Sequence, residues 1–597
     1  MSDLVQLARK AGLEPIWTDA AGKKQTVSPD TLRAVLHTLG YATATSGDIA
    51  ESLHAIDAEN AQREAASQAG NHARAFSFAD ITARKLWAAA VQVYALRSET
   101  AVDFGDFAAL GRFAEDAATQ GADGVAISPV HALFGARPAH VSPYSPSTRL
   151  FLNPLYIATT ETPPRRNDDA LIDWPSAHRR KIDALWQVFE TFRWTDSLTR
   201  EFHAFSQAGG ERLLAHARFE VLDARFIDQG IYGWRNWPND WRDADSPSVK
   251  ALNETDRAVR FQLFLQWQAE RGLADAQARA EKAGMKIGLI ADMAVGVDPD
   301  GSLAWSSPDE MLEGLNIGAP PDLFNTTGQD WGLTTFSPRA LRNTGYSGFI
   351  ATLQAAMRHA GGMRLDHAMG LQRLWVIPRG ASPADGVYLK FPIDDLVRLI
   401  VRESRAHECV VIAEDLGTVP AGFHDEIARS ALYGMRVLWF ERDKRGRFRA
   451  PDRWDDDATA LSTTHDLPTI AGWWTGNDIA WQEKKSPATF DRAVAEKARA
   501  HDRKMLWDAL IAADIAHGAM PTEPGPVIDA ALAFLAETPC PLAIIPVEDL
   551  LGLREQPNLP GTIDEHPNWR RRLADERVFE NELARSRAAI LTRARNT

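Results

Sequence analysis

The chain has 597 residues, 45% of them hydrophobic and 24% charged, a size that predicts one large catalytic domain with insertions or a small accessory domain. A formal net charge of −14 disfavours nonspecific binding to nucleic acid, which requires a basic surface. The sequence contains no apolar run long enough to cross a bilayer, and its first residues lack the pattern of a secretory signal. We therefore expect a cytoplasmic protein with neither a nucleic acid nor a membrane as partner.

The first 75 residues predict a small N-terminal helical domain followed by a linker. The stretch LVQLARKAG has helical character, and Ser28-Pro29-Asp30 is a typical helix start, with Gly40 as the end of that helix. Residues 57–76 are rich in Ala, Gln and Glu, which is typical of a linker or an exposed helix. We expect the catalytic domain to span residues 76–597.

Short β-branched runs then alternate with amphipathic helical stretches, which is the pattern of βα units around a parallel sheet. Eight such units predict the α/β fold class and, within it, a (β/α)8 TIM barrel with large insertions. The long gap between the second and third runs predicts a mostly helical insertion at about residues 150–280. The runs are residues 91–96, 124–130, 286–293, 362–368, 409–417, 435–441, 460–466 and 542–552.

Three of these runs have an acidic residue at or near their carboxyl end, namely Asp366, Glu414 and Asp466. The carboxyl ends of barrel strands converge on one cavity, so these side chains are expected to meet there. Cleavage of a glycosidic bond with retention needs an acid and a nucleophilic carboxylate about 5 Å apart. A single acid at a strand end more often caps a helix or pairs with arginine. Three acids together with Arg364 and His465 favour a catalytic site instead.

The segments Arg364-Leu365-Asp366-His367, Glu414-Asp415-Leu416-Gly417 and His465-Asp466 resemble conserved regions of the α-amylase clan, specifically the amylomaltases of glycoside hydrolase family 77. The resemblance implies that Asp366 is the nucleophile, Glu414 the general acid/base and Asp466 the stabiliser of the transition state. Arg364 would keep the nucleophile ionised from the same strand face, and Glu414 would need a raised pKa. The resemblance also implies that substrate contacts come from His465, His367 and Asp415.

Further matches extend the resemblance over most of the chain. The loop at residues 318–332, GAPPDLFNTTGQDWG, resembles the family's mobile loop over the acceptor subsites, with Phe324 and Trp331 as apolar platforms for sugar rings. Tyr144 in SPYSP matches a position used for sugar stacking, and Asp292 matches the acid after the third strand, which orders the site or contacts sugar. Near the C-terminus, the stretch LPGTIDEHPNW is close to the family's terminal signature, with Trp569 expected to pack.

The resemblance implies a 4-α-glucanotransferase that uses α-1,4-glucans and malto-oligosaccharides as donors and glucose or maltose as acceptors, with retention. One alternative keeps the chemistry but transfers the sugar to water, as in an amylase-type hydrolase. Another is a noncatalytic glucan-binding protein on the same fold. The sequence has no phosphate-binding glycine loop or clustered metal ligands, and its two cysteines, Cys409 and Cys540, provide no disulfide framework or zinc site. We therefore expect no cofactor, and the sequence leaves the oligomeric state open.

Overall fold

Eight parallel strands form a sheet in the order β13-β10-β7-β4-β3-β16-β15-β14. The computed structural model describes residues 3–19, 22–66, 73–98, 103–159, 169–321, 327–487, 490–574 and 576–595. Tyr433 joins the two outer strands, because its N–H donates to the Val411 carbonyl (2.9 Å) and its carbonyl accepts from Ala413 (2.7 Å). The sheet therefore closes in chain order, and the predicted (β/α)8 barrel is confirmed. Its strands are β3 (Leu86–Val91), β4 (Gly124–Ile127), β7 (Gly288–Met293), β10 (Gly362–Leu365), β13 (Val410–Ala413), β14 (Gly434–Val437), β15 (Ala458–Leu461) and β16 (Leu542–Pro546).

The first predicted strand is wrong. Residues 91–96 share only Val91 with β3, and the rest of that run lies in the short 3-10 helix Val93–Ala95 and its flanking residues. The true strand, LWAAAV, is rich in alanine, and its only β-branched residue is Val91, whereas β-branched residues mark most of the other runs. Five of its six residues are buried, so packing inside the barrel overrides the weak local preference for a strand.

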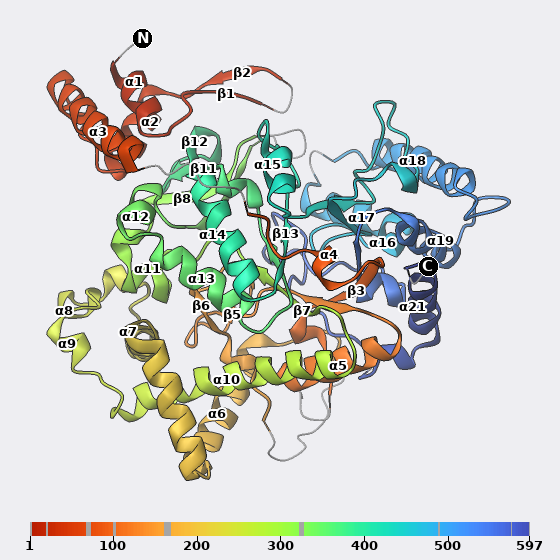
Figure 1. The fold of residues 1–597 in the computed structure, drawn as a ribbon, viewed down its shortest axis with the longest axis horizontal. Coiled ribbons are helices and arrows are strands. Elements are labelled where there is room, and N and C mark those ends of the chain that lie inside the picture. The colour runs from red at the N-terminus through yellow and green to blue at the C-terminus, as the bar shows by residue number, and fades with distance from the viewer. Residues whose placement is uncertain are drawn as a thin grey trace.

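Helices surround the barrel (Figure 1). Asp106 caps α5, accepting a hydrogen bond from the Ala109 N–H (2.8 Å), and α5 packs against α10. At the other end of the chain, α19 packs against α21, which lies beside the C-terminus. These helices are α5 (Phe107–Thr119), α10 (Arg257–Lys282), α13 (Ser347–Met357), α14 (Ile393–Ala406), α15 (Phe423–Arg429), α16 (Ile470–Thr475), α17 (Asn477–Lys485), α18 (Arg492–Ala512), α19 (Pro524–Glu537), α20 (Val547–Leu551) and α21 (Glu582–Arg595).

The segment between β4 and β7 contains a hairpin and several further helices. The hairpin, β5 (His131–Ala132) and β6 (Thr148–Leu152), lies close to the barrel and carries residues that reach the candidate site. Trp234 and Trp237 are buried beside Phe219 and Phe226, so this segment has an aromatic core of its own. Its helices before α10 are α6 (Trp174–Thr191), α7 (Asp196–Ile227), α8 (Asn239–Arg242) and α9 (Pro247–Lys250).

A four-stranded antiparallel sheet, which the sequence did not predict, lies beside the barrel in the order β12-β11-β8-β9. Its strands are β8 (Leu315–Ala319), β9 (Gln329–Leu333), β11 (Arg373–Pro378) and β12 (Val387–Lys390), and the neighbouring helices are α11 (Ser302–Ser306) and α12 (Pro338–Asn343). The N-terminal elements pack here, because Glu14 N–H donates to the Tyr388 carbonyl (2.9 Å) and the rings of Trp17 and Trp375 are 5.0 Å apart.

The N-terminal segment contains a β-hairpin as well as the expected helices. It comprises α1 (Asp3–Lys10), β1 (Ile16–Thr18), β2 (Lys24–Thr26), α2 (Pro29–Thr38) and α3 (Ser46–Ala66), and α4 (Phe78–Ile81) follows before the barrel. As predicted, α2 begins at Pro29, with Ser28 as its cap. Each strand of the hairpin has only three residues, too few for a recognisable alternating pattern.

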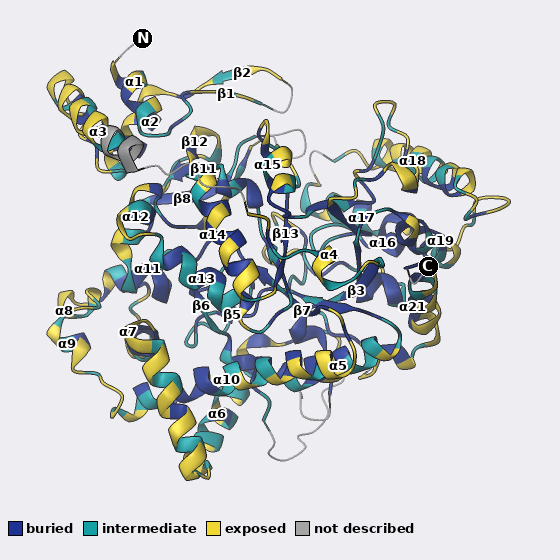
Figure 2. Ribbon diagram, in the orientation of Figure 1, coloured by how far each residue is buried: buried dark blue, intermediate teal, exposed yellow. Residues whose placement is uncertain are grey.

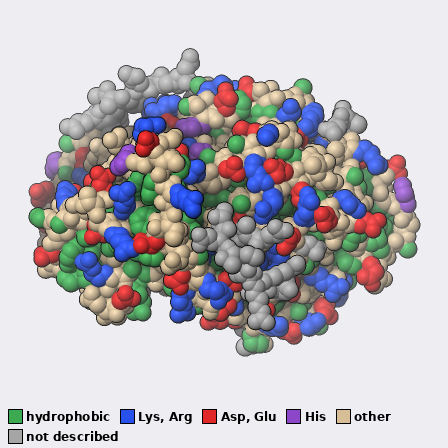
Figure 3. Space-filling model, turned by 90° about the horizontal axis from the view of Figure 1, so that it is seen from below, with side chains coloured by type: hydrophobic (Ala, Val, Ile, Leu, Met, Phe, Trp, Pro, Cys, Tyr) green, Lys and Arg blue, Asp and Glu red, His purple; other side chains and the backbone are tan. Residues whose placement is uncertain are grey.

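Buried residues concentrate on the barrel strands, whereas exposed residues are frequent on α3, α8, α9 and α18 (Figure 2). None of the helices in the described ranges combines the length and apolar character needed to cross a membrane. On the face shown in Figure 3, acidic and basic side chains are interspersed. The net negative charge therefore does not form a single patch on that face.

Candidate active site

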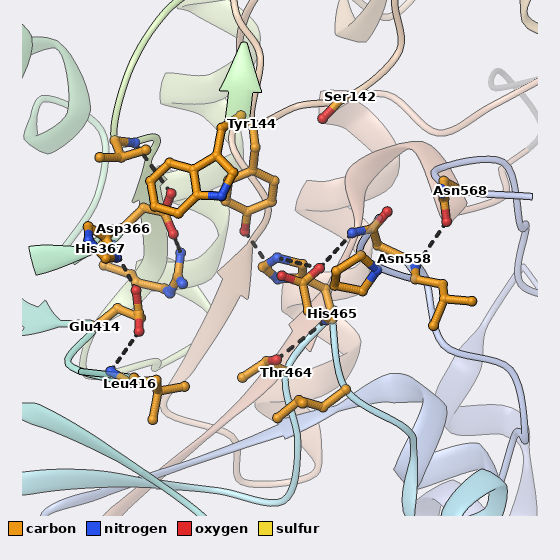
Figure 4. Close-up of a pocket in the computed structure, with 18 of the residues that line it drawn as sticks. Ser142, Tyr144, Asp366, His367, Glu414, Leu416, Thr464, His465, Asn558 and Asn568 are labelled. Carbon is orange, nitrogen blue, oxygen red and sulfur yellow. Dashed lines mark hydrogen bonds and ion pairs between the residues drawn. The ribbon is translucent and has the colours of Figure 1, made fainter. Parts of the chain in front are cut away.

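A cleft of about 2380 Å³ lies at the carboxyl ends of the barrel strands. In Figure 4, Asp366, His367 and Glu414 lie on one side of it, His465 and Asn558 lie on the other, and Tyr144 lies between them. Asp292 lies beside the cleft in contact with Tyr144 and Arg364, and Phe324 is outside the described residues. The predicted site residues that line the cleft are Tyr144, Trp331, Arg364, Asp366, His367, Glu414, Asp415, His465 and Asp466.

Asp366 follows β10 and receives two kinds of contact. Arg364, two residues earlier, places Nη1 3.0 Å from Asp366 Oδ1, as the strand spacing predicts. The same Nη1 donates to both carboxylate oxygens of Asp292, at 2.8 and 2.9 Å. The second contact comes from the backbone, because the Val295 N–H donates to Asp366 Oδ2 (3.3 Å). A buried cation and a backbone amide thus contact the Asp366 carboxyl group, one at each oxygen.

Asp292 links this pair to Tyr144 and His465. The Tyr144 hydroxyl donates to Asp292 Oδ2 (2.6 Å) and lies 3.2 Å from His465 Nδ1. The rings of Tyr144 and His465 stack, with centroids 4.5 Å apart and planes inclined by 23°. Burial raises the pKa of Asp292, although the positive charge of Arg364 opposes this rise. The ring and the hydroxyl of Tyr144 are therefore both held in place.

Glu414 is 7% exposed and accepts two backbone hydrogen bonds. His367 N–H donates to Oε2 (2.8 Å), and Leu416 N–H donates to Oε1 (2.7 Å). Burial raises the pKa of Glu414 to about 7, against the lowering effect of Arg364 and with a further rise from the charge of Asp366. This carboxyl group can therefore hold a proton near neutral pH and release it again.

His367 has a left-handed backbone conformation, with φ at 46°. This conformation is unfavourable for a residue other than glycine, and such strain tends to occur at functional sites. Here the strained backbone directs the His367 N–H at Glu414. Its ring meets the Trp331 ring edge-on at 5.1 Å. Trp331 belongs to β9, so the second half of the predicted loop at 318–332 includes a strand.

Asp466 is the most exposed of the three carboxylates, with 42% of its side chain accessible. Asn558 Nδ2 donates to its Oδ1 (2.6 Å), and His465 Nε2 lies 3.4 Å from the same oxygen. Gln556 Nε2 donates to the Asp466 carbonyl (3.0 Å). Asn558 was not predicted from the sequence. Its only signal was its position directly before the terminal signature LPGTIDEHPNW, which begins at Leu559.

Asp415 lines the cleft, but its carboxylate contacts other residues. Oδ1 accepts from Met435 N–H (2.8 Å), while Oδ2 contacts Arg436 Nη1 (3.0 Å) and His424 Nδ1 (3.1 Å). These partners lie on β14 and α15. The contacts support a positioning role for Asp415, whereas its predicted sugar contact stays a prediction.

Trp569 packs, as expected, with its ring 5.6 Å from Tyr144 and 5.5 Å from His465. Trp174 Nε1 donates to the Trp569 carbonyl (2.9 Å), which holds the backbone of Trp569 in place. Within the described ranges, no group of three or more His, Cys, Asp or Glu side chains is arranged to hold a metal ion.

A (β/α)8 barrel with three carboxylates around one cleft, one of them a buried acid with a pKa near neutrality, has the design of an enzyme that cleaves glycosidic bonds. The family model described as 4-alpha-glucanotransferase, glycoside hydrolase family 77, matches residues 91–577, and the chain belongs to this family.

Known relatives agree with this assignment. The chain is 35% identical to a 4-alpha-glucanotransferase of Mycobacterium tuberculosis over 524 residues, covering 82% of this chain and 71% of that protein. It is 32% identical to the Haemophilus influenzae 4-alpha-glucanotransferase over 557 residues, covering 86% and 79%. The crystal structure of the Corynebacterium glutamicum amylomaltase matches with a TM-score of 0.86 at 26% identity, covering 99% of each chain. An amylomaltase from Streptococcus agalactiae in complex with acarbose shares the fold, with a TM-score of 0.68 at 18% identity, covering 86% of this chain and 98% of that one.

Proposed function

We propose that this enzyme moves α-1,4-glucan segments from a donor malto-oligosaccharide to the 4-hydroxyl of an acceptor sugar through a covalent glycosyl-aspartate. The observation that carries the proposal is the contrast between two neighbouring carboxyl groups. Asp366 contacts the Arg364 guanidinium, whereas burial raises the pKa of Glu414 to about 7. Retaining glycoside chemistry requires one carboxylate that can attack and a second carboxyl group that can supply a proton.

In the first step, an Asp366 oxygen attacks the anomeric carbon while Glu414 gives its proton to the departing glucan oxygen. The C–O bond to the leaving glucan breaks with its electron pair, and a β-linked glycosyl-aspartate forms. In the second step, Glu414 removes the proton from the acceptor 4-hydroxyl, whose oxygen displaces Asp366. Two inversions give net retention. We assign to Asp466 the stabilisation of positive charge that develops on the sugar ring in both steps.

Substrate contacts follow from the positions of the side chains around these carboxyls. Tyr144 offers a ring face, and His465 has Nε2 on the side of Asp466, where it can meet sugar hydroxyls. Trp331 lines the cleft. This supports our assignment of the segment at 318–332, including Phe324, to the part of the cleft that binds the acceptor sugar. We propose glucose or maltose as acceptors, residues 76–597 as the catalytic unit behind an N-terminal unit at 1–75, and a cytoplasmic location.

The test is product analysis with maltotriose as the only substrate. The parent should form both shorter and longer malto-oligosaccharides, and Asp366→Asn and Glu414→Gln should each abolish the longer products. Asp502→Asn, on α18 and outside the cleft lining, is the control that should behave like the parent. Maltose and glucose in equal amounts without longer products would identify a hydrolase instead. Failure to convert maltotriose would contradict the proposal.

A further inference from the structure

Arg149 on β6 is a buried arginine outside the carboxylate cluster. It is 4% exposed and forms no ion pair with any carboxylate in the described ranges. Burial lowers its pKa to about 10, so it still carries its charge at neutral pH. Its Nη1 donates to the carbonyl oxygens of Ala294 (2.9 Å) and Val295 (3.0 Å). Burying a charge without a counter-ion costs free energy, so the contacts between Arg149 and these two peptide carbonyls call for a role that offsets this cost.

One of these peptides also contacts the candidate nucleophile. The Ala294 carbonyl and the Val295 N–H are the two ends of a single peptide unit. Arg149 binds the carbonyl end at 2.9 Å, while the N–H end donates to Asp366 Oδ2 at 3.3 Å. A peptide unit is planar and rigid, so fixing its carbonyl also fixes its N–H. A cation at the carbonyl further polarises the unit and strengthens the hydrogen bond from the N–H.

The rest of the hairpin that carries Arg149 holds the same segment. His131, on β5, lies with Nε2 3.4 Å from the Ala294 N–H, and burial lowers its pKa to about 3, so this nitrogen stays available as an acceptor. Asp298 N–H donates to the Pro146 carbonyl (2.8 Å), just before β6. The Phe336 ring lies beside the Arg149 guanidinium, 5.3 Å from centroid to Cζ. Several contacts thus fix the backbone that follows β7.

We propose that Arg149 is a positioning residue for the glycosylation step, acting through the peptide unit between Ala294 and Val295 to orient and stabilise the ionised Asp366. This inference rests on the proposed function, in which Asp366 is the nucleophile. Arg364 contacts Oδ1 of that carboxylate and the Val295 amide contacts Oδ2, so the two supports act on different oxygens. Without Arg149 the carbonyl end of this peptide unit loses its charged donor, so the amide is held less firmly and the attacking carboxylate loses alignment.

The experiment compares Arg149→Met and Arg149→Lys with Arg595→Met in the full-length protein. Arg595 is a matched control: it is 1% exposed, burial lowers its pKa to about 10, and its Nη1 donates to the carbonyls of Leu86 (2.9 Å) and Cys540 (3.0 Å). Leu86 begins β3, so this arginine lies at the opposite end of the barrel from the candidate site. The readouts are Tm, transfer from maltotriose, and the pH profile of kcat/KM for α-maltosyl fluoride.

The fluoride donor isolates the nucleophile. Asp366 attacks the anomeric carbon and the C–F bond breaks with its electron pair, so fluoride leaves without a proton from Glu414. A misplacement of the nucleophile by about 1 Å costs on the order of 100-fold in rate. Arg149→Met should therefore lose about 100-fold in kcat/KM with either donor, and the acidic limb of its profile should move to higher pH. Arg149→Lys, which keeps the charge, should retain more activity, and Arg595→Met should lower Tm alone.

The inference is overturned if Arg149→Met matches Arg595→Met in kcat/KM and pH profile. If Arg149→Met does not fold, Arg149→Lys provides the test. In that case the inference is overturned if Arg149→Lys has the kcat/KM of the parent and an unshifted pH profile. A parent that releases no fluoride, or an Asp366→Asn variant as active as the parent, would instead overturn the proposed function and this inference with it. If the activity of the parent depends on Asp366 but does not change when Arg149 is substituted, this inference is refuted and the proposed function stands.

Discussion

Replacement of Tyr144 by phenylalanine tests how the site is organised. The substitution keeps the ring that stacks on His465 at 4.5 Å and removes the hydroxyl that donates to Asp292 Oδ2 at 2.6 Å. A hydrogen bond to a charged group contributes about 1.5–3 kcal/mol. At about 1.4 kcal/mol for each tenfold change in rate, the loss corresponds to about 10- to 150-fold in kcat/KM if the bond is needed in the transition state. Loss of this donor should also raise the pKa of Asp292 further.

The assay is the kcat/KM for maltotriose disproportionation, measured for Tyr144→Phe, Tyr144→Ala and a control. Tyr433→Phe is suitable as the control because the Tyr433 hydroxyl accepts from the Phe78 N–H (3.3 Å), away from the cleft lining. We expect Tyr144→Ala to be worse than Tyr144→Phe, and Tyr433→Phe to stay within about twofold of the parent. Parental activity in Tyr144→Phe together with a large loss in Tyr144→Ala would show that only the ring matters, and the argument from Asp292 would be refuted.

The barrel could be predicted because most of its strands combine an apolar, β-branched run with a polar end. The run CVVIAEDLG shows both features, and β13 lies within it. The antiparallel sheet could not be predicted in the same way. β8 and β11 pair through Ile317 and Val376, far apart in the chain, and their short runs contain no information about which partner each will find. Strand pairing over such separations is decided by tertiary packing.

The side-chain groups of the candidate site could be predicted from the sequence, whereas its backbone hydrogen-bond donors could not. Arg364 and Asp366 share a strand face, so their contact follows from a spacing of two residues. The amides of Val295, His367 and Leu416 donate to catalytic carboxyls, and any residue type can supply an amide. The raised pKa of Glu414 was expected only from its implied role. Its cause, burial, became visible once the surrounding strands were in place.

Three further predictions concern proton binding and hydrogen bonds. Because Glu414 has a pKa of about 7 and must begin protonated, kcat/KM for maltotriose should fall above about pH 7. The kcat/KM for α-maltosyl fluoride should show no such fall, because this donor needs no proton from Glu414. An identical fall with both donors would contradict the assignment. Asn558→Ala removes a 2.6 Å hydrogen bond to Asp466 and should lower kcat/KM about tenfold, whereas Asn477→Ala, which removes a 3.2 Å bond to a backbone carbonyl, should not. Glu220→Gln should change the pH dependence of stability, because burial raises the pKa of Glu220 from 4.5 to about 8. The folded state then binds more protons than the unfolded state between these values, so the free energy of unfolding falls as pH rises, by about 2 kcal/mol between pH 6 and pH 8 for this group. Glutamine cannot titrate, so urea unfolding at the two pH values should show a smaller loss in the variant by that amount, and equal losses in both proteins would mean that Glu220 is already ionised at pH 6.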